Sequence, residues 1–165
     1  DVWMRQNILK AQIISAEFSA NYYISNNYSI LLSYNYSDNI AKSETHQNLP
    51  YNPGQSLNFK FTAKQNISRN IKISEFVSLR SVYGRSAWSW KPEAGTDPTN
   101  TYGLTTALAD YQKLDAGINI CFFNKYHTYF NVGNILGQNI ENSDDAYTII
   151  DGEPIYKIGL RFDFK

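Results

Sequence analysis

The 165-residue sequence predicts an all-β fold, an antiparallel up-and-down sheet in which each strand has one apolar and one polar face. Three observations indicate this fold. Residue polarity alternates with a period of two in seven segments, the connections between them alternate short and long, and aromatic residues gather near segment ends. A period of two is typical of β-strands, because successive side chains point to opposite faces.

The closing segment, residues 154–165, shows the alternation most clearly. Its apolar side is formed by Tyr156, Ile158, Leu160, Phe162 and Phe164. Its polar side is formed by Lys157, Gly159, Arg161 and Asp163. A strand with so apolar a face needs an apolar partner or solvent beside it.

Three strands are expected in the first half of the chain, at 8–24, 28–37 and 57–64. Their apolar sides hold Ile14, Ala16, Phe18, Ala20 and Tyr22, then Tyr28, Ile30, Leu32, Tyr34 and Tyr36, then Leu57, Phe59, Phe61 and Ala63. The opposite sides are dominated by serine, asparagine and lysine, with Glu17 in the first strand. Each segment therefore predicts a strand with one apolar face.

Three more strands are expected at 71–83, 114–122 and 126–133. Their apolar sides hold Ile71, Ile73, Val77 and Leu79, then Leu114, Ala116, Ile118, Ile120 and Phe122, then Tyr126, Thr128, Phe130 and Val132. Glu75 interrupts the first of these sides. Because a carboxylate is unfavourable on a lipid-facing side, we expect a β-bulge that turns Glu75 to the other face.

The lengths of the connections indicate how the strands are arranged. Short turns at 25–27, 65–70 and 124–125 alternate with long stretches at 38–54, 84–111 and 137–153. Transmembrane β-barrels have short turns on one side of the membrane, longer loops on the other, and aromatic girdles at both interfaces. We therefore expect part of a transmembrane β-barrel of the bacterial outer membrane. The alternative is a soluble all-β domain whose strands pack over a core.

Composition narrows the function classes. Apolar residues make up 42% of the chain and the mean hydropathy is -0.44, so no run approaches the roughly 20 apolar residues of a membrane helix. Lys and Arg balance Asp and Glu, so binding to nucleic acid is not indicated. Cys121 is the single cysteine and cannot form an internal disulfide. With no signal peptide before Asp1, the chain is expected to be a piece of a longer precursor.

Four short motifs resemble stretches of TonB-dependent outer-membrane receptors. They are residues 11–17 (AQIISAE), 49–53 (LPYNP), 114–117 (LDAG) and 132–141 (VGNILGQNIE). They stand in the family's order, and together with the closing strand they are spread along nearly the whole chain. Ser15, Leu136 and Ile140 replace the glycine, phenylalanine and tyrosine that the family usually has at these places.

The resemblance implies that residues 1–165 are the C-terminal part of a barrel of about 22 strands, whose lumen is filled by a plug domain. It implies active uptake of a scarce nutrient, coupled to the TonB complex through the plug, with a ferric siderophore as the leading cargo. Cobalamin, haem or an oligosaccharide is the alternative within the family. A small stand-alone barrel of the porin or adhesin kind is another alternative.

The closing strand also resembles the signal that the barrel-assembly machinery reads on outer-membrane proteins. That signal places a polar residue, a glycine two positions on, and then aromatics. Lys157, Gly159, Phe162 and Phe164 fit it. Lys165 departs from it, since the family usually ends on the aromatic residue. Phe162 and Phe164 can also be read as lipid-facing girdle residues, and the two roles are compatible.

One loop has the composition of a ligand-binding site. Trp88, Trp90 and Lys91 are exposed aromatics beside a cation, which can hold an apolar or anionic ligand by stacking and charge. They can equally belong to an aromatic girdle, and in a soluble domain the tryptophans would suit a carbohydrate. In the barrel, the polar side chains are expected to face the plug; they are Glu17, Lys60, Lys64, Arg80, Asp115, Lys157 and Arg161.

No catalytic constellation is expected, and the chain is not expected to be an enzyme. His46 and His127 are distant in sequence from each other and Cys121 is alone, so neither a metal site nor a cofactor is predicted. Asp144 and Asp145 are adjacent in a long loop, where a solvated pair is the simplest interpretation and a calcium site the alternative.

Overall fold

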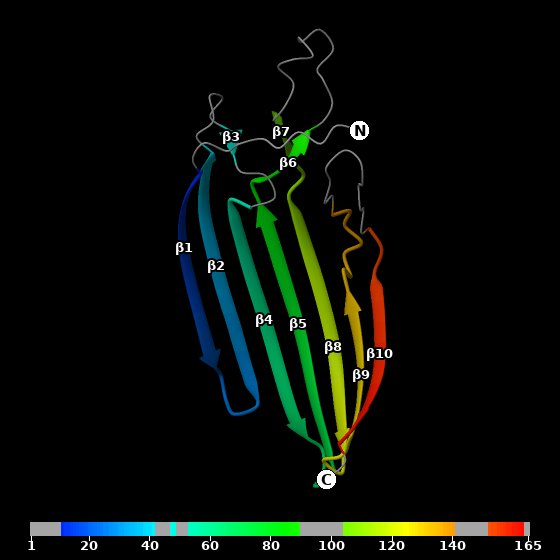
Figure 1. Cartoon of the computed structure of the whole chain (residues 1–165). Helices are drawn as coiled ribbons and strands as arrows, with labels where there is room; N and C mark the ends of the chain where they lie inside the picture. Colours follow the sequence, from blue (N-terminus) through cyan, green and yellow to red (C-terminus); the bar gives the residue numbers. More distant parts are fainter. Residues whose placement is uncertain (1–10, 42–46, 49–52, 90–103, 141–151, 164–165) are drawn as a thin grey trace.

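A computed structural model describes residues 11–41, 47–48, 53–89, 104–140 and 152–163. All its regular elements are β-strands (Figure 1). They are β1 (Ala11–Tyr23), β2 (Tyr28–Ala41), β3 (Gln47–Asn48), β4 (Gln55–Asn66), β5 (Ile71–Tyr83), β6 (Arg85–Ser89), β7 (Leu104–Leu108), β8 (Tyr111–Phe122), β9 (Tyr126–Gly133) and β10 (Ile155–Phe162). Within the described ranges, no helix could cross a bilayer.

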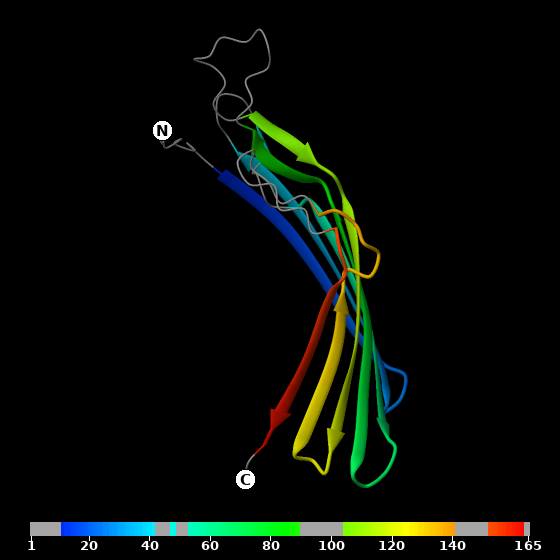
Figure 2. The ribbon, with the colours of Figure 1, turned by 90° about the vertical axis from the view of Figure 1, so that its right-hand side faces the viewer.

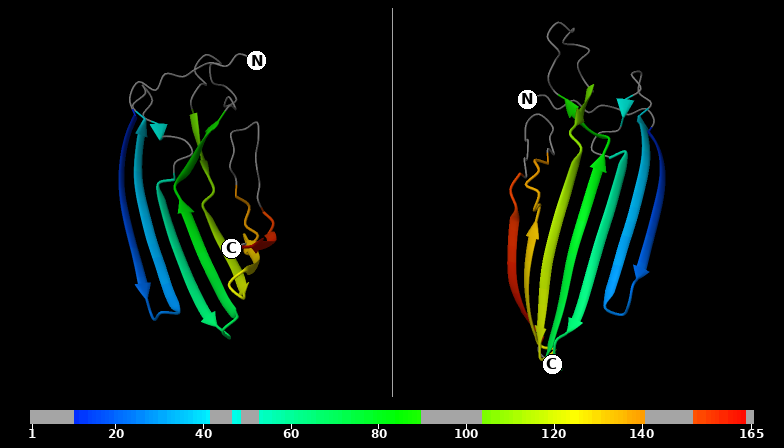
Figure 3. Two further views of the ribbon diagram at one scale, coloured as in Figure 1. Left: turned by 60° about the horizontal axis from the view of Figure 1, so that its bottom comes forward. Right: turned by 180° about the vertical axis from the view of Figure 1, so that it is seen from behind.

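The main sheet is an up-and-down meander. Its order is β1-β2-β4-β5-β8-β9-β10, and each neighbouring pair is antiparallel. The strand ends joined by the short turns all lie at one end of the sheet, which we call the short-turn end (Figures 1 and 3). The predicted all-β class, the antiparallel order and all seven strands are therefore confirmed. No closed barrel is formed by the described residues, and the sheet is an open arc (Figure 2).

The long connection before β8 contains a feature that the sequence did not predict. β6 and β7 pair as a separate two-stranded ribbon, with Arg85 opposite Leu108 and Trp88 opposite Thr105. The sequence predicts only a long connection at 84–111, which contains two Pro and three Gly residues. Gly84 precedes β6 and the other four lie between the two short strands in sequence, so they do not prevent the strands from pairing.

The register is uninterrupted across the centre of the sheet. β4 pairs with β5 from Gln55↔Tyr83 to Asn66↔Lys72, and β5 pairs with β8 from Ile71↔Phe122 to Val82↔Tyr111. The expected bulge at Glu75 is therefore wrong. Glu75 is exposed between Ala63 and Ile118 on the apolar face. A bulge would have turned every following residue of β5 to the opposite face, which is unfavourable for a half-apolar strand.

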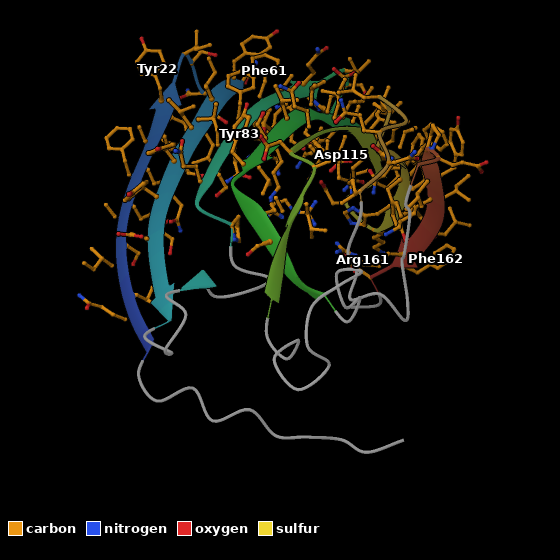
Figure 4. All side chains as sticks on the ribbon, turned by 90° about the horizontal axis from the view of Figure 1, so that it is seen from above. Tyr22, Phe61, Tyr83, Asp115, Arg161 and Phe162 are labelled. Carbon is orange, nitrogen blue, oxygen red and sulfur yellow. The ribbon has the colours of Figure 1, made fainter. Side chains whose placement is uncertain are left out.

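The two faces of the arc differ sharply in polarity. Tyr22, Phe61 and Phe162 point out from the convex face, whereas Asp115 and Arg161 point into the concave face (Figure 4). In the seven strands of the meander (β1, β2, β4, β5, β8, β9 and β10), the only Asp, Glu, Lys, Arg or His residues that the structure places on the convex face are Asp38 and Glu75. The period-two pattern of the sequence is thus expressed as two chemically distinct surfaces.

The convex face has no protein layer over it in the described part of the chain. Ile158 is 79% exposed and Leu160 is 70% exposed. The buried apolar residues among those described are Ala63, Val82 and Ile140. Aromatic pairs connect neighbouring strands on this face instead: Tyr28 and Phe61 have ring centroids 6.1 Å apart, and Tyr126 meets Phe162 edge-on at 5.7 Å. Such pairs stabilise a sheet without a core behind it.

The register predicts an alternating pattern of amide exchange in the edge strand β10. Because the Asp163 amide donates to Lys125 O, the odd-numbered amides of β10 point toward β9 and the even-numbered ones point to the open edge. In the 165-residue chain in detergent, Gly159 and Arg161 should exchange more slowly than Ile158 and Leu160. We expect roughly a fivefold difference, since one hydrogen bond contributes about 1 kcal/mol net. NMR-detected hydrogen exchange measures it.

The same measurement contains its own control. In the central strand β5, both odd and even amides have ladder partners, so no alternation is expected there. Alternation in β5, or equal exchange along β10, would contradict the register.

Candidate functional site

The concave face carries an open hollow at the short-turn end, with a volume of about 410 Å³. Four strands contribute to it. Lys64 comes from β4, Lys72 from β5, Cys121 from β8 and His127 from β9, all on the concave face by register. Asp163, just beyond β10, completes the wall. We call this feature the basal hollow.

The turn between β8 and β9 positions two residues of the basal hollow, Cys121 and His127. Phe123 and Asn124 adopt left-handed φ angles of 53° and 56°, and the Lys125 amide donates to Phe122 O at 3.0 Å. This tight reversal puts Cys121 directly opposite His127. Left-handed backbone is unusual for a phenylalanine and easier for an asparagine. The short turn therefore fixes which side chains meet in the hollow.

His127 is part of a charged cluster. Its Nε2 lies 3.1 Å from Asp163 Oδ2. Arg161 holds the same carboxylate with two nitrogens, Nε at 3.2 Å from Oδ1 and Nη2 at 3.3 Å from Oδ2. A two-pronged guanidinium fixes a carboxylate in one plane and compensates its charge. The His127 side chain is only 18% exposed, so the cluster is anchored at the histidine.

Cys121, His127 and Asp163 do not form a catalytic triad. The Cys121 Sγ lies 3.8 Å from His127 Nε2, which is the same atom that meets Asp163. A triad needs one ring nitrogen for the nucleophile and the other for the carboxylate. Within the described residues no set of three His, Cys, Asp or Glu side chains is arranged to hold a metal ion. Instead, Arg161 and His127 hold the Asp163 carboxylate in a fixed position.

The sequence separated these residues, and the structure brings them together. In the sequence, Cys121 is the single cysteine and nothing links it to His127. The turn predicted at 124–125 would set Cys121 opposite Thr128, whereas the observed turn has three residues, 123–125, and sets Cys121 opposite His127. The contact to Asp163 comes from β10, after the long loop 137–153. No local pattern in the sequence predicts it.

Across the concave face, basic side chains outnumber acidic ones. On the concave face of the seven meander strands, the basic residues are Lys60, Lys64, Lys72, Arg80, Lys113, Lys157 and Arg161. The acidic residues on this face are Glu17, Asp115 and, just beyond β10, Asp163. The Lys60 ammonium lies 5.0 Å from the centroid of the Phe76 ring, a cation–π contact. Although the chain is neutral overall, this face is positive.

Asp115 has a structural role that the sequence did not predict. Its Oδ1 accepts a hydrogen bond from the Asn134 amide at 2.8 Å. The Asn134 side chain, fully buried, donates to Gln138 O at 3.1 Å, and Gln138 Oε1 accepts from the Gln112 amide at 2.7 Å. These hydrogen bonds therefore join the start of β8 to the segment 134–138 in one unit. Asp115 secures the end of β9 rather than standing free on the concave face.

The expected ligand-binding residues are only partly placed. Trp88 lies on β6, while Trp90 and Lys91 lie outside the described residues. The base of the β6–β7 ribbon is well anchored: the Gly84 amide donates to Asp110 Oδ1 at 2.9 Å, and the Arg85 guanidinium lies 4.8 Å from the centroid of the Tyr111 ring. The ribbon therefore holds the start of the tryptophan segment at the end of the sheet opposite the basal hollow (Figure 1).

The expected assembly residues lie along β10, except Phe164, which is outside the described residues. Lys157 is opposite Asn131, Gly159 opposite Tyr129 and Phe162 opposite Tyr126. A Cβ added to Gly159 would fall on the Tyr129 ring, so the glycine leaves room for that ring on the concave face. The glycine of the motif therefore has a packing reason, whatever machinery reads the strand.

Substituting Gly159→Ala should destabilise the β9–β10 pair, because the new methyl group forces the Tyr129 ring away. Overpacking of this kind costs about 1–3 kcal/mol. Urea unfolding of the 165-residue chain in detergent, followed by circular dichroism, measures the change. In a Tyr129→Ala background the same substitution should be nearly neutral.

Gly54→Ala is the matched control for that substitution. The nearest heavy atom to a Cβ there is Gly84 O at 3.6 Å, an ordinary contact, so little change is expected. Equal losses at Gly54 and Gly159, or no relief in the Tyr129→Ala background, would show that Tyr129 is not the cause.

Comparisons with protein-family models, with curated proteins and with solved structures found no match to this chain. In the described part of the chain, three features bear on function: an apolar convex face without a protein layer over it, a positive concave face, and the edge strands β1 and β10, each paired on one side only.

Proposed function

We propose that residues 1–165 form the C-terminal wall of a TonB-dependent receptor in the bacterial outer membrane. The receptor takes up a scarce nutrient, with a ferric siderophore as the leading cargo, and is driven by the TonB complex acting on the plug. In this proposal the remaining strands complete a barrel of about 22 strands around that plug. The segment itself contributes wall, outer loops and assembly signal, and performs no catalysis.

The observation that carries the proposal is the uncovered convex face. Large apolar side chains are exposed over its whole length, from Tyr22 at one edge to Ile158 at the other. Monomeric soluble proteins rarely expose apolar patches above a few hundred Å². Lipid provides the apolar phase that such a face needs, and lipid-facing sides alternate with lumen-facing sides along every strand of a membrane barrel. A soluble domain would need a second layer, which the described residues do not provide.

The edges of the sheet favour a piece of a larger barrel over a small stand-alone one. β1 and β10 run in the same direction, because each step along the meander reverses the strand (Figure 1). Joining them would create a parallel pair, whereas single-chain bacterial barrels are antiparallel with an even strand count. Further strands are needed between the two edges, since unpaired backbone groups in hydrocarbon cost several kcal/mol each.

Within this proposal, each face has a partner. The convex face contacts outer-membrane lipid, the concave face surrounds the plug, and the edges pair with the remaining strands. Trp88, Trp90 and Lys91 belong to the outer loops and are candidates for contact with the cargo. Lys157, Gly159, Phe162 and Phe164 are candidates for recognition by the barrel-assembly machinery. Cobalamin, haem or an oligosaccharide remains the alternative cargo, and no nucleic-acid partner is proposed.

The direct test is to locate the protein and identify its cargo. In a Gram-negative cell, the product of the gene that contains this sequence should fractionate with the outer membrane, resist extraction by alkaline carbonate, and migrate differently on gels before and after heating. The same reading frame should encode a plug domain upstream of Asp1. Deleting the gene should lower uptake of labelled ferric siderophore under iron limitation. Recovery in the soluble fraction would reject the membrane assignment, and a frame without a plug would reject the receptor class.

A pair of neighbouring substitutions tests the lipid-facing assignment. Val77 is 43% exposed on the convex face, and Ser78 lies next to it on the concave face. Val77→Lys should lower the stability of the membrane-inserted protein by about 2–4 kcal/mol if it lies near the bilayer midplane, whereas Ser78→Lys should be tolerated. Urea titration in lipid vesicles measures both. A convex face in water would leave Val77→Lys neutral.

A further inference from the structure

The basal hollow is rich in hydrogen-bond donors. Its lining includes two lysines, three asparagines and a histidine: Lys64, Lys72, Asn66, Asn119, Asn124 and His127. These residues come from adjacent strands in fixed register and from the β8–β9 turn. At about 410 Å³, the hollow has room for a group several times larger than a water molecule, which occupies about 30 Å³ in the liquid.

The charges in the hollow are unevenly compensated. Among the residues that the structure describes, no carboxylate lies within ion-pair distance of Lys64 or Lys72. Asp163 is the only carboxylate of the lining. Its oxygens are already engaged by Arg161 at 3.2 Å and 3.3 Å and by His127 at 3.1 Å. The carboxylate is therefore compensated locally, and Lys64 and Lys72, which both line the hollow, have no described carboxylate that neutralises their charge.

We infer that the basal hollow is a binding site for an oxyanion of the carboxylate class. Lys64 and Lys72 supply its positive charge, and the asparagine amides supply neutral hydrogen-bond donors. The Arg161–Asp163 pair holds His127 in place at the rim. The carboxylate can belong to a free small molecule or to an acidic side chain of a polypeptide that enters the concave face. This inference concerns the chain itself and does not depend on the receptor assignment.

Cys121 provides a direct probe, because it lines the hollow and is the only cysteine in the chain. We would compare its rates of reaction with a negatively and a positively charged methanethiosulfonate of similar size, on the full 165-residue chain in neutral detergent. In water, a unit charge on the order of 7 Å away changes the local concentration of a monovalent ion about threefold. Two lysines should therefore favour the anionic reagent clearly, and added salt should weaken the preference.

The variants isolate the two lysines. Lys64→Gln with Lys72→Gln should lower the anion-to-cation rate ratio at least tenfold. Arg80→Gln is the matched control, since Arg80 lies on the same face of β5 but eight residues further along the strand from Lys72. Because the same thiolate attacks both reagents and displaces methanesulfinate from each, the ratio is independent of how reactive the thiol becomes in each variant. Circular dichroism confirms that each variant is folded.

Protection of Cys121 tests binding itself. Citrate and a short glutamate-rich peptide would be titrated while Cys121 reacts with an uncharged maleimide. Saturable protection by citrate identifies a small-molecule site, and protection by the peptide alone identifies a site for acidic side chains. Both should disappear in the Lys64→Gln, Lys72→Gln variant and persist in Arg80→Gln. No saturable protection by either probe, or protection that survives the double substitution, would overturn the inference.

Discussion

The structure depends on one constraint, an unbroken antiparallel register from β1 to β10. Because strand side chains alternate faces with a period of two, a slip of one residue in any pair would exchange the two surfaces of that strand. The pairs Ala63↔Glu75 and Glu75↔Ile118 show how strictly the constraint is kept, since it places a carboxylate on the apolar side rather than allow a bulge. The charge of Glu75 is the local consequence of preserving the pattern of the whole sheet.

That constraint also explains why the sheet has no core of its own. A β-sheet with one apolar face normally buries that face against another layer of secondary structure. Here Phe61, Val77 and Ile158 point outward from the convex side, and cross-strand contacts such as Tyr126–Phe162 provide the packing on that side. Without a second layer or a closed ring, the described strands hold together mainly through their backbone ladders. In the proposed receptor, lipid and the remaining strands of the barrel supply the rest of the stability.

The same register also determines which side chains meet on the concave face. It aligns the lysines of β4 and β5 with the asparagine, cysteine and histidine of β8 and β9 around the basal hollow. At the other end of β8, it brings Asp115 to the buried Asn134, just beyond the end of β9. The concave side chains therefore divide into two groups. Some, such as Asp115 and Tyr129, are occupied in holding strands together, and others, such as Lys64 and Lys72, are available to a partner.

Much of this fold followed from the sequence alone. The alternation of residues 154–165 and of the six other segments predicted the strands and their two faces, because a period of two is a property of local backbone geometry. The alternation of short and long connections predicted the up-and-down order. Tertiary structure decided what depends on distant segments. It rejected the bulge at Glu75, formed the β6–β7 ribbon, joined Asp115 to Asn134, and brought Asp163 to His127 across a long loop. The polarity of each face depends on the residues of a single strand, so the sequence shows it directly. Contacts between strands depend on which strands pair and in which register, and the pattern within one strand does not specify its neighbour.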